Sequence, residues 1–431
     1  MTSELAVFIY LPDETSAVPA GLLEIEENGP EVISSSFVYG TRYLERPARL
    51  EIDPGALGFA RGQAVKGVRL FPTGGLTLFG GIRDAAPDAW GRRVIENRLG
   101  VPANSLPESQ YLLRAGSNRA GALDIRESPD DSSDPGLIGS VQRLDDVLEA
   151  ARAIEAGEPV PPHLHEIFDA GPSFGGMRPK ASVIDEAQNE WIAKLPSRDD
   201  RSFSVPAIEY GALKLAAECG LNVPDVKLVA LGPDRPVLLV RRFDRVKTAS
   251  GTARRHYISA LTLLNVHESQ SPAMSYPDIA AHQSTFGASG SVKEQQAELF
   301  GRMVFNIFVS NDDDHLRNHG FLWTVDGWVL SPLFDVVPRP SHATEKFLHL
   351  GIGDAGRTAT LTNAMSKHAV FGLDRPAALR TIGRIWSVVQ QWRAFFATWS
   401  IPAQQIDLIA PAFRHAEDIG GKDIGLTPAG P

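Results

Sequence analysis

The chain has 431 residues, a length at which one hydrophobic core usually gives way to two, so we expect two packed domains. Its hydrophobic fraction of 43% and charged fraction of 22% exclude a largely disordered or fibrous chain. The formal net charge of −10 provides no overall attraction to nucleic acid or to anionic membranes.

Cysteine content and hydropathy indicate the compartment. Cys219 is the one cysteine, so an intrachain disulfide and a cysteine-based structural zinc site are both excluded, and we expect a buried structural thiol. The chain does not open with a basic region followed by an apolar stretch, and no run of about 18 apolar residues occurs. These features predict a cytoplasmic protein with no membrane partner.

The N-terminal part of the chain is predicted to be β-rich. Short apolar runs at 5–10 and 36–39 alternate with proline and glycine breaks. Helical spacing follows at 89–99 and returns at 144–156. The polar segment 127–136 between these helices has the composition of a loop or linker.

A second β-rich stretch begins after Ser173 and leads into a helical region. The predicted elements are, in order, hairpin strands at 181–184 and 191–194, a helix at 207–218, and strands at 226–231 and 237–241. From Lys293 onward helices predominate. An apolar and aromatic stripe from Ile385 to Trp399 predicts a buried helix face in this region.

The predicted fold class is therefore α+β. A small β-rich N-terminal domain precedes a two-lobed domain whose C-terminal lobe is large and helical. The predicted divisions are an N-terminal domain at 1–105, a connecting segment at 106–160, a first lobe at 161–250, a helical lobe at 251–415 and a flexible tail at 416–431.

The densest polar cluster is the segment 311–319, which lies between an apolar run and a strand-like segment. A solvated turn would explain it, because turns collect Asp and Asn. However, Asp313 and Asn318 are five residues apart, the separation at which a kinase catalytic loop places an Asp on the substrate hydroxyl and an Asn on Mg²⁺. Segment 327–335 is predicted to be an apolar strand that ends in Asp335, where this carboxylate would bind the same metal; an ordinary turn after a strand is the alternative.

Upstream residues have features suited to a nucleotide. Segment 171–180 is glycine-rich and cationic, and glycine lets backbone N–H groups approach phosphate oxygens, although an ordinary turn is the alternative. Lys194 interrupts an apolar strand. Its ammonium would either bind a phosphate or reach solvent from the edge of the sheet. Glu209 on the next helix is a candidate partner for Lys194. Segment 241–245 follows a strand at the place where a kinase hinge offers backbone groups to adenine; a charged strand end is the alternative.

These elements occur in the order found in kinases, and several motifs together resemble the HipA-like kinases of bacterial type II toxin–antitoxin systems. The resemblance extends from the N-terminal domain to about Ile401. The matching motifs are 84–93, 175–180, 191–196, 242–245, 311–320 and 333–335. The first of these, 84–93, has no obvious reaction chemistry, and we interpret it as structural or interfacial, with docking of a substrate or an antitoxin as the alternative.

The resemblance implies a protein-kinase-like fold and an ATP- and Mg²⁺-dependent serine/threonine protein kinase. It implies Asp313 as catalytic base, assisted by Lys194, and Asn318 and Asp335 as Mg²⁺ ligands. It also implies autophosphorylation at Ser173, which switches such kinases off. Implied nucleotide contacts come from Gly175, Gly176, Met177, Arg178, Pro179, Lys180, Lys194, Arg241, Phe243, His315, Arg317, Asn318 and Asp335.

The implied partners are a protein substrate, which is an aminoacyl-tRNA synthetase in known cases, and a small helix-turn-helix antitoxin that also binds DNA. The leading hypothesis is a growth-arresting toxin. The alternatives are a kinase outside a toxin–antitoxin system and a non-catalytic nucleotide-binding scaffold. A further alternative is a metal-dependent hydrolase whose ligands would be Asp312, Asp313, Asp314, His315 and His319.

Overall fold

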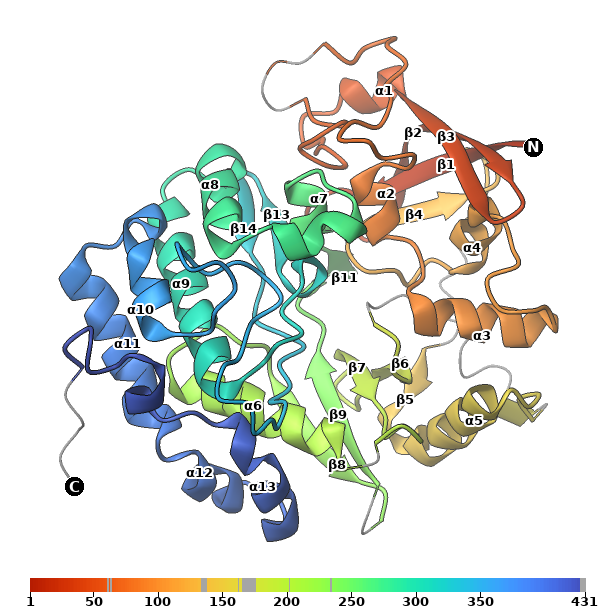
Figure 1. The fold of residues 1–431 in the computed structure, drawn as a ribbon. Coiled ribbons are helices and arrows are strands. Elements are labelled where there is room, and N and C mark those ends of the chain that lie inside the picture. The colour runs from red at the N-terminus through yellow and green to blue at the C-terminus, as the bar shows by residue number, and fades with distance from the viewer. Residues whose placement is uncertain are drawn as a thin grey trace. The chain divides into compact units, whose positions relative to one another are not determined.

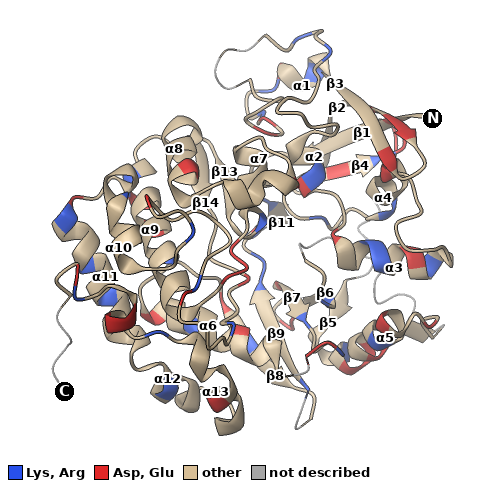
Figure 2. Ribbon diagram, viewed as in Figure 1, with Lys and Arg blue, Asp and Glu red and all other residues tan. Residues whose placement is uncertain are grey.

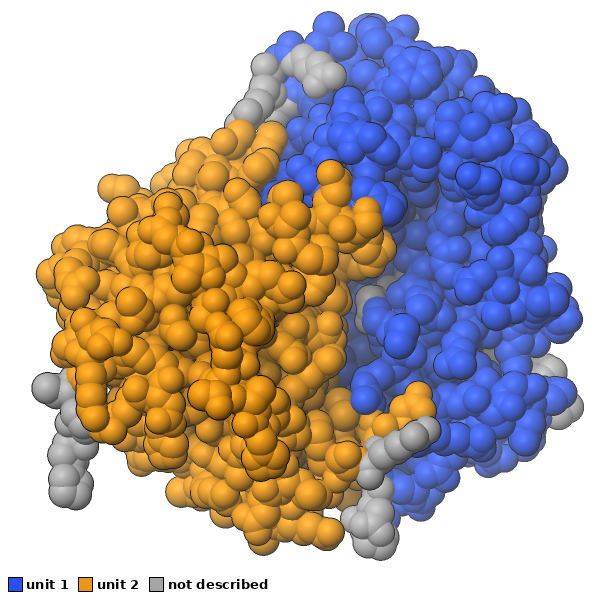
Figure 3. All heavy atoms as spheres, in the orientation of Figure 1, with its two compact units in different colours: residues 1–198, 231–235, 239–267 blue, residues 199–230, 236–238, 268–431 orange. Residues whose placement is uncertain are grey.

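The computed structural model describes residues 1–59, 62, 64–132, 138–161, 163–164, 176–200, 202–232 and 235–426. The chain forms two compact units (Figure 3). Unit 1 contains residues 1–198, 231–235 and 239–267, and unit 2 contains residues 199–230, 236–238 and 268–431. The two-domain expectation from chain length therefore holds, whereas the predicted five-segment division stays a prediction.

Unit 1 opens with a four-stranded sheet in the order β3-β2-β1-β4 (Figure 1). The strands are β1 (Thr2–Tyr10), β2 (Ala17–Asn28), β3 (Glu31–Tyr39) and β4 (Leu123–Arg126), and β1 pairs antiparallel with β2 and β4. The run Leu5–Tyr10 is buried throughout, which accounts for its unbroken apolar sequence. The predicted β-rich N-terminal region is thus present.

Unit 1 also contains short helices. They are α1 (Thr41–Leu44), α2 (Gly80–Asp84), α3 (Ala89–Leu99), α4 (Glu108–Arg114) and α5 (Leu144–Ala156). Both α3 and α5 begin and end where the sequence predicted, and both end at a glycine in the left-handed conformation, at φ 64° and 71°. Each also carries acidic and basic residues (Figure 2).

A second sheet in unit 1 positions the lysines of the predicted nucleotide site. It contains β5 (Gly139–Ser140), β6 (Lys180–Ile184) and β7 (Glu190–Lys194), and β6 and β7 form the predicted antiparallel hairpin. Lys180 is directly opposite Lys194 in this register. Ala181 and Ala193 form the next pair in this register, and both face the core, at 3% and 0% exposed. Because side chains alternate along a strand, both lysines lie on the other face of the hairpin.

The chain crosses between the units within β9. Strand β8 (Val226–Ala230) and the first half of β9 (Pro236–Arg241) belong to unit 2, whereas Leu239–Arg241 belong to unit 1. The remaining elements of unit 1 are β10 (Arg245–Thr248), β11 (Gly251–Arg254), β12 (Tyr257–Ser259) and α7 (Ala260–Leu263), of which β10 and β11 form an antiparallel hairpin.

Unit 2 is mainly helical, as the sequence predicted (Figure 1). Its helices are α6 (Val205–Glu218), α8 (Tyr276–Phe286), α9 (Val292–Val309), α10 (Leu361–Ser366), α11 (Arg375–Val389), α12 (Trp392–Thr398) and α13 (Ala403–Ile409). Its one described hairpin is formed by β13 (Gly320–Thr324) and β14 (Gly327–Leu330). Cys219 is buried at the end of α6, and burial raises the pKa of its thiol to about 12.

Two local predictions were wrong. The stripe from Ile385 to Trp399 does not lie on one helix, because α11 ends at Val389 and α12 begins at Trp392. Asp335 does not end a strand, because β14 stops at Leu330. In both places the apolar spacing continues past the end of the element, since residues in the adjoining segments are also buried. No helix among the described residues is both long enough and apolar enough to cross a membrane.

Candidate active site

The predicted catalytic loop starts where α9 ends in unit 2. Ser310 closes this helix in the left-handed conformation, at φ 50°, and turns the chain into the polar segment that starts at Asn311. The Ser310 hydroxyl donates a hydrogen bond to the Ala412 carbonyl oxygen at 2.6 Å. The start of the loop is therefore anchored to the C-terminal part of unit 2.

Asp313 and Asn318 are joined across the loop. The Asn318 side-chain amide donates to the Asp313 carbonyl oxygen at 2.8 Å, and residues Leu316–Asn318 form a single turn of 3₁₀ helix. The five-residue separation noted in the sequence thus corresponds to a closed loop. The bond uses the amide nitrogen of Asn318, so its amide oxygen is the atom left to bind a metal.

The Asp313 carboxylate is about half exposed and contacts one cation closely. Its Oδ2 accepts a hydrogen bond from Arg339 Nη2 at 2.7 Å, and its Oδ1 lies 4.0 Å from His315 Nε2. The Nε of Arg339 lies 3.2 Å from Asp312 Oδ1. One guanidinium therefore bridges two neighbouring carboxylates of the loop.

The next carboxylate, Asp314, has a different environment. Its side chain is buried, accepts hydrogen bonds from the Tyr276 hydroxyl and the His349 backbone N–H, both at 2.6 Å, and has a pKa raised to about 7 by burial. The Asp314 side chain thus points into the protein interior, and its hydrogen bonds anchor the loop there. The sequence shows three consecutive Asp residues without indicating that one of them points inward.

A buried polar network extends beneath Asp314. Tyr276 accepts a hydrogen bond from the Asn306 side chain at 2.9 Å, and Asn311 donates to the same asparagine at 3.1 Å. The ring of His319 packs edge-on against Tyr276 at 5.2 Å, and burial lowers the pKa of His319 to about 3, so it is neutral at physiological pH. The network connects helices α8 and α9 to the catalytic loop.

The contacts of the five side chains proposed as hydrolase metal ligands do not favour that interpretation. Asp314 and His319 are buried and engaged with protein groups, whereas Asp312 and Asp313 share Arg339. Within the described part of the chain, no group of three or more His, Cys, Asp or Glu side chains is arranged to hold a metal ion. A metal bound by one carboxylate and one amide oxygen, completed by water and phosphates, would need no such group.

The other predicted residues of unit 2 lie around this loop. Asp335 has a left-handed backbone, at φ 55°, between the buried side chains of Leu333 and Val336. His315 is 34% exposed, and its ring lies 5.9 Å from that of His349. Arg317, predicted to contact the nucleotide, forms an ion pair with Glu268 at 3.1 Å.

In unit 1 several residues of the motif 84–93 contact other parts of the same unit. Asp88 caps α3 by accepting from the Gly91 N–H at 2.6 Å, and its other carboxylate oxygen lies 2.9 Å from the Lys180 ammonium. The Trp90 indole N–H donates to the Lys180 carbonyl oxygen at 2.9 Å. Asp84 accepts from the backbone and hydroxyl of Ser259, and Arg92 pairs with Glu108.

Lys180, which the resemblance predicts to contact the nucleotide, pairs with Asp88 in the structure. Its side chain is 4% exposed and its charge is compensated by Asp88. Gly176 lies against it: a Cβ added to this glycine would be 3.0 Å from Lys180 Nζ, and Gly176 adopts φ +110°, which L side chains rarely do. Met177 and Arg178 are exposed, and Pro179 is buried.

The remaining predicted nucleotide residues are only partly described. Lys194 is half-buried at the end of β7 in unit 1, and Glu209 is buried on α6 in unit 2, so their predicted pairing stays a prediction. Ser173 and Gly175 lie outside the described residues.

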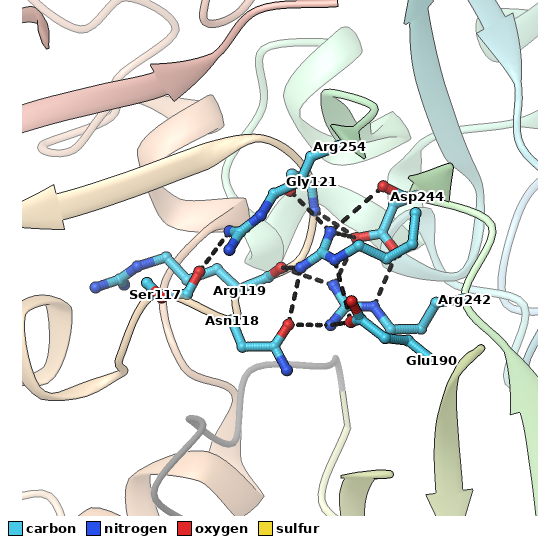
Figure 4. Close-up of polar contacts among 9 residues, drawn as sticks. Ser117, Asn118, Arg119, Gly121, Glu190, Arg242, Asp244 and Arg254 are labelled. Carbon is cyan, nitrogen blue, oxygen red and sulfur yellow. Dashed lines mark hydrogen bonds and ion pairs between the residues drawn. The ribbon is translucent and has the colours of Figure 1, made fainter. Parts of the chain in front are cut away.

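The motif 242–245 is the centre of a buried ion network in unit 1 (Figure 4). Arg242 donates to both carboxylate oxygens of Asp244, at 2.9 and 2.7 Å, and to the carbonyl oxygen of Arg119 at 2.8 Å. Arg245 donates to Asp244 at 2.9 Å and lies 3.2 Å from Glu190. Asp244 in turn accepts from the Gly121 N–H at 2.8 Å.

This network has strong electrostatic effects. Burial alone would raise the pKa of Asp244, but the guanidinium groups of Arg242 and Arg245 hold it well below the usual range. Burial first, and the neighbouring charge of Arg242 second, lower the pKa of Arg245 to about 9. At the predicted hinge, the Arg242 N–H donates to the Glu190 carbonyl oxygen at 3.0 Å, Arg241 is exposed and Phe243 is half-buried.

Comparison with known proteins identifies the family. The family model described as the HipA-like C-terminal domain matches residues 172–392, more than half of the chain. This chain belongs to the HipA-like kinase family. The resemblance predicted from its motifs is therefore confirmed.

Two proteins with similar sequences are consistent with the assignment. The serine/threonine-protein kinase toxin HipA of Shewanella oneidensis is 24% identical over 204 residues, which cover 40% of this chain and 45% of that protein. The Haemophilus influenzae protein named "Putative kinase" is 26% identical over 184 residues, which cover 39% of this chain and 52% of that protein. The chain thus spans about half the length of these curated relatives.

The HipA-like fold extends over nearly the whole molecule. A chain from the HipA, HipB and operator DNA complex of the Shewanella oneidensis MR-1 toxin–antitoxin system has a TM-score of 0.62 and 17% sequence identity. The alignment covers 96% of this chain and 95% of that chain. The predicted α+β fold, with its β-rich N-terminal region and helical C-terminal part, is confirmed.

Sequence reasoning missed Arg339, Tyr276 and His349. Arg339 lies four residues after Asp335 in a proline-flanked segment that has no periodicity. Tyr276 follows a serine that caps α8, a pattern that predicts a helix start but not a buried hydroxyl. His349 contributes its backbone N–H to Asp314, and no side-chain pattern reveals that contact.

Proposed function

We propose that this chain is an ATP- and Mg²⁺-dependent serine/threonine protein kinase. The observation that carries the proposal is the loop in which Asn318 donates to the Asp313 carbonyl oxygen, in a chain that belongs to the HipA-like kinase family. This loop gives the predicted base and the predicted metal ligand a common frame, as kinase catalytic loops require. Segments 161–250 and 251–415 would be its two lobes.

Asp313 acts as the general base in this proposal. The substrate hydroxyl gives its proton to the Asp313 carboxylate, and the hydroxyl oxygen forms a bond to the γ-phosphorus of ATP. The bond between that phosphorus and the bridging oxygen breaks, and ADP leaves with the electron pair. The half-exposed position of Asp313 supports this role, because a base must be reachable by a protein substrate.

Asn318 and Asp335 would hold Mg²⁺. Amide and carboxylate oxygens suit this cation, which usually keeps several waters and shares its coordination with phosphates. When bound, Mg²⁺ neutralises charge on the phosphates. The left-handed turn at Asp335 lies between two buried side chains, which supports a fixed carboxylate.

The proposed nucleotide contacts are those that the family resemblance implies. Gly175 to Arg178 would approach the phosphates through their backbone and Arg178, with Lys194, His315 and Arg317 contributing charge or hydrogen bonds. Lys180 would act indirectly, because its pairing with Asp88 fixes the end of this loop. The backbones of Arg241 and Phe243 would contact adenine, since the Arg242 N–H is engaged with Glu190.

We further propose that the kinase is the growth-arresting toxin of a cytoplasmic toxin–antitoxin pair. A small helix-turn-helix antitoxin would bind it and link it to DNA, and its substrate would be a protein of the translation machinery such as an aminoacyl-tRNA synthetase. Phosphorylation of Ser173 by another copy would switch it off. The support is family membership and the fold shared with a chain of the HipA, HipB and operator DNA complex.

The test is incubation of the purified protein with radiolabelled ATP, Mg²⁺ and cell lysate. Wild type should label itself and at least one lysate protein, whereas Asp313→Asn should label neither. No incorporation by the correctly folded wild type would refute the kinase proposal. Labelling without growth arrest on overexpression would refute the toxin role alone.

A further inference from the structure

We propose that Arg339 is a positioning residue for the catalytic base, an inference that rests on the proposed kinase function. Its guanidinium contacts Oδ2 of Asp313 at 2.7 Å and, through a different nitrogen, Oδ1 of Asp312 at 3.2 Å. A carboxylate held at one oxygen can no longer rotate freely about its Cβ–Cγ bond. The geometry therefore leaves Oδ1 of Asp313 for the substrate hydroxyl.

The surroundings of Oδ1 fit this assignment. Nε2 of His315 lies 4.0 Å from Oδ1, which is beyond hydrogen-bond distance. A general base must come within about 2.6–3.2 Å of the group that it deprotonates, so an accessible and fixed oxygen is required. The Asp313 side chain is 48% exposed, which leaves room for a hydroxyl to approach.

Arg339 is itself held by the loop that it organises. Its backbone N–H donates to the Ser310 carbonyl oxygen at 3.2 Å. Two residues earlier, the Val337 N–H donates to the Asn311 side chain at 3.4 Å. The segment after Asp335 therefore lies along the start of the catalytic loop, and replacing the Arg339 side chain leaves these backbone contacts in place.

The contact requires the shape of arginine as well as its charge. Arg339 uses Nε for one carboxylate and Nη2 for the other, which the planar guanidinium allows and a lysine ammonium does not reproduce. The Arg339 side chain is 52% exposed, so the bridge should contribute little to folding. A positioning role predicts a large effect on turnover with a small effect on stability.

The experiment measures phosphoryl transfer by wild type, Arg339→Gln and Arg339→Lys, with saturating and varied ATP. We expect Arg339→Gln to lower kcat about 10-fold or more, with the KM for ATP within about twofold of wild type, because the base acts on the hydroxyl and not on the bound nucleotide. Arg339→Lys should recover only part of kcat. The melting temperature should change by less than about 3 °C in each variant.

Arg393→Gln is a matched control. Arg393 forms a similar half-exposed ion pair, 2.8 Å from Asp407, with its own side chain 53% exposed. This variant removes the same chemical group from another part of unit 2. Its kcat should stay at the wild-type value.

The double variant Asp313→Asn/Arg339→Gln separates positioning from a general structural role. If Arg339 acts through Asp313, the second substitution should not lower the residual rate of Asp313→Asn further. An additional loss of about 10-fold, or a wild-type kcat in Arg339→Gln, would overturn the positioning role. A folded wild type without any phosphoryl transfer would instead refute the kinase proposal, and the positioning role with it.

Discussion

The ion pair between Asp88 and Lys180 makes a quantitative prediction about unit 1. The two charged groups are 2.9 Å apart and their side chains are 8% and 4% exposed. The substitution Asp88→Asn removes the negative charge but keeps a side chain that caps α3 at Gly91 equally well. The lysine ammonium, which is 4% exposed, would then lose the counter-charge that Asp88 provides.

The expected loss follows from burial. Removing one partner of a buried ion pair costs about 3–5 kcal/mol, whereas an exposed pair contributes between 0 and about 1 kcal/mol. We therefore expect Asp88→Asn to lower the free energy of unfolding of unit 1 by about 3–5 kcal/mol. For a unit of this size, this corresponds to a fall in melting temperature on the order of 10 °C.

Urea denaturation followed by circular dichroism, together with amide hydrogen exchange of 89–99 and 180–184, would measure the effect. Exchange should accelerate most in these two segments, because the pair joins the start of α3 to the start of β6. Glu45→Gln is the control, since it removes an ion pair with Lys66 at 3.2 Å whose side chains are 62% and 65% exposed.

The single variant Lys180→Met and the double variant Asp88→Asn/Lys180→Met complete a double-mutant cycle. The double variant removes both charges, so it should be more stable than Asp88→Asn alone. A loss of less than about 1 kcal/mol in Asp88→Asn, comparable with Glu45→Gln, would refute the conclusion that the pair is buried and charged.

Four further predictions concern the candidate active site. Asp335→Ala should abolish the rise in melting temperature that Mg²⁺ and ATP together cause in wild type, as measured by differential scanning fluorimetry; an unchanged rise would remove Asp335 from the metal site. Asp313→Asn should bind ATP normally in calorimetry but transfer phosphate roughly 100-fold or more slowly; more than a tenth of the wild-type rate would contradict its role as base. Intact-mass spectrometry after incubation with ATP should show one added phosphate that is absent in Ser173→Ala and appears on inactive Asp313→Ala when active enzyme is mixed in; failure there would exclude transfer between molecules. For Asp314, burial raises the pKa from 3.8 to about 7, so its contribution to stability is fully present below about pH 4 and is lost as pH rises through 7, an effect of roughly 4 kcal/mol. In thermal unfolding, the stability of Asp314→Asn relative to wild type should therefore rise between pH 5 and pH 8. A difference in melting temperature that does not change with pH would contradict the raised pKa of Asp314.

Local signals in the sequence determined several elements of the fold. Helix α3 begins after an aspartate cap and ends at Gly100, and α5 ends at Gly157, so both boundaries are encoded by neighbouring residues. Strand β7 alternates half-buried and buried residues, the pattern expected when one face of a strand lies against the core. The order of the motifs also indicated the HipA-like family, which the family model confirms.

The candidate base and metal ligands were likewise predicted from a local feature. Asp313 and Asn318 belong to one short loop, so their separation in sequence constrains their separation in space. Asp335 was predicted from its place after an apolar run, although the strand ends at Leu330. Their roles in catalysis stay predictions that the substitutions above test.

Only the tertiary structure decided which distant side chains contact the charged residues of the predicted site. Lys180 contacts Asp88 across 92 positions of sequence, Tyr276 contacts Asp314 across 38, and Arg339 contacts Asp313 across 26. Helical and strand periodicity report which side of an element is buried, but not which distant segment packs against it. For that reason the sequence shows three adjacent aspartates as equivalent, whereas packing makes Asp314 an internal anchor and leaves Asp312 and Asp313 to share one arginine.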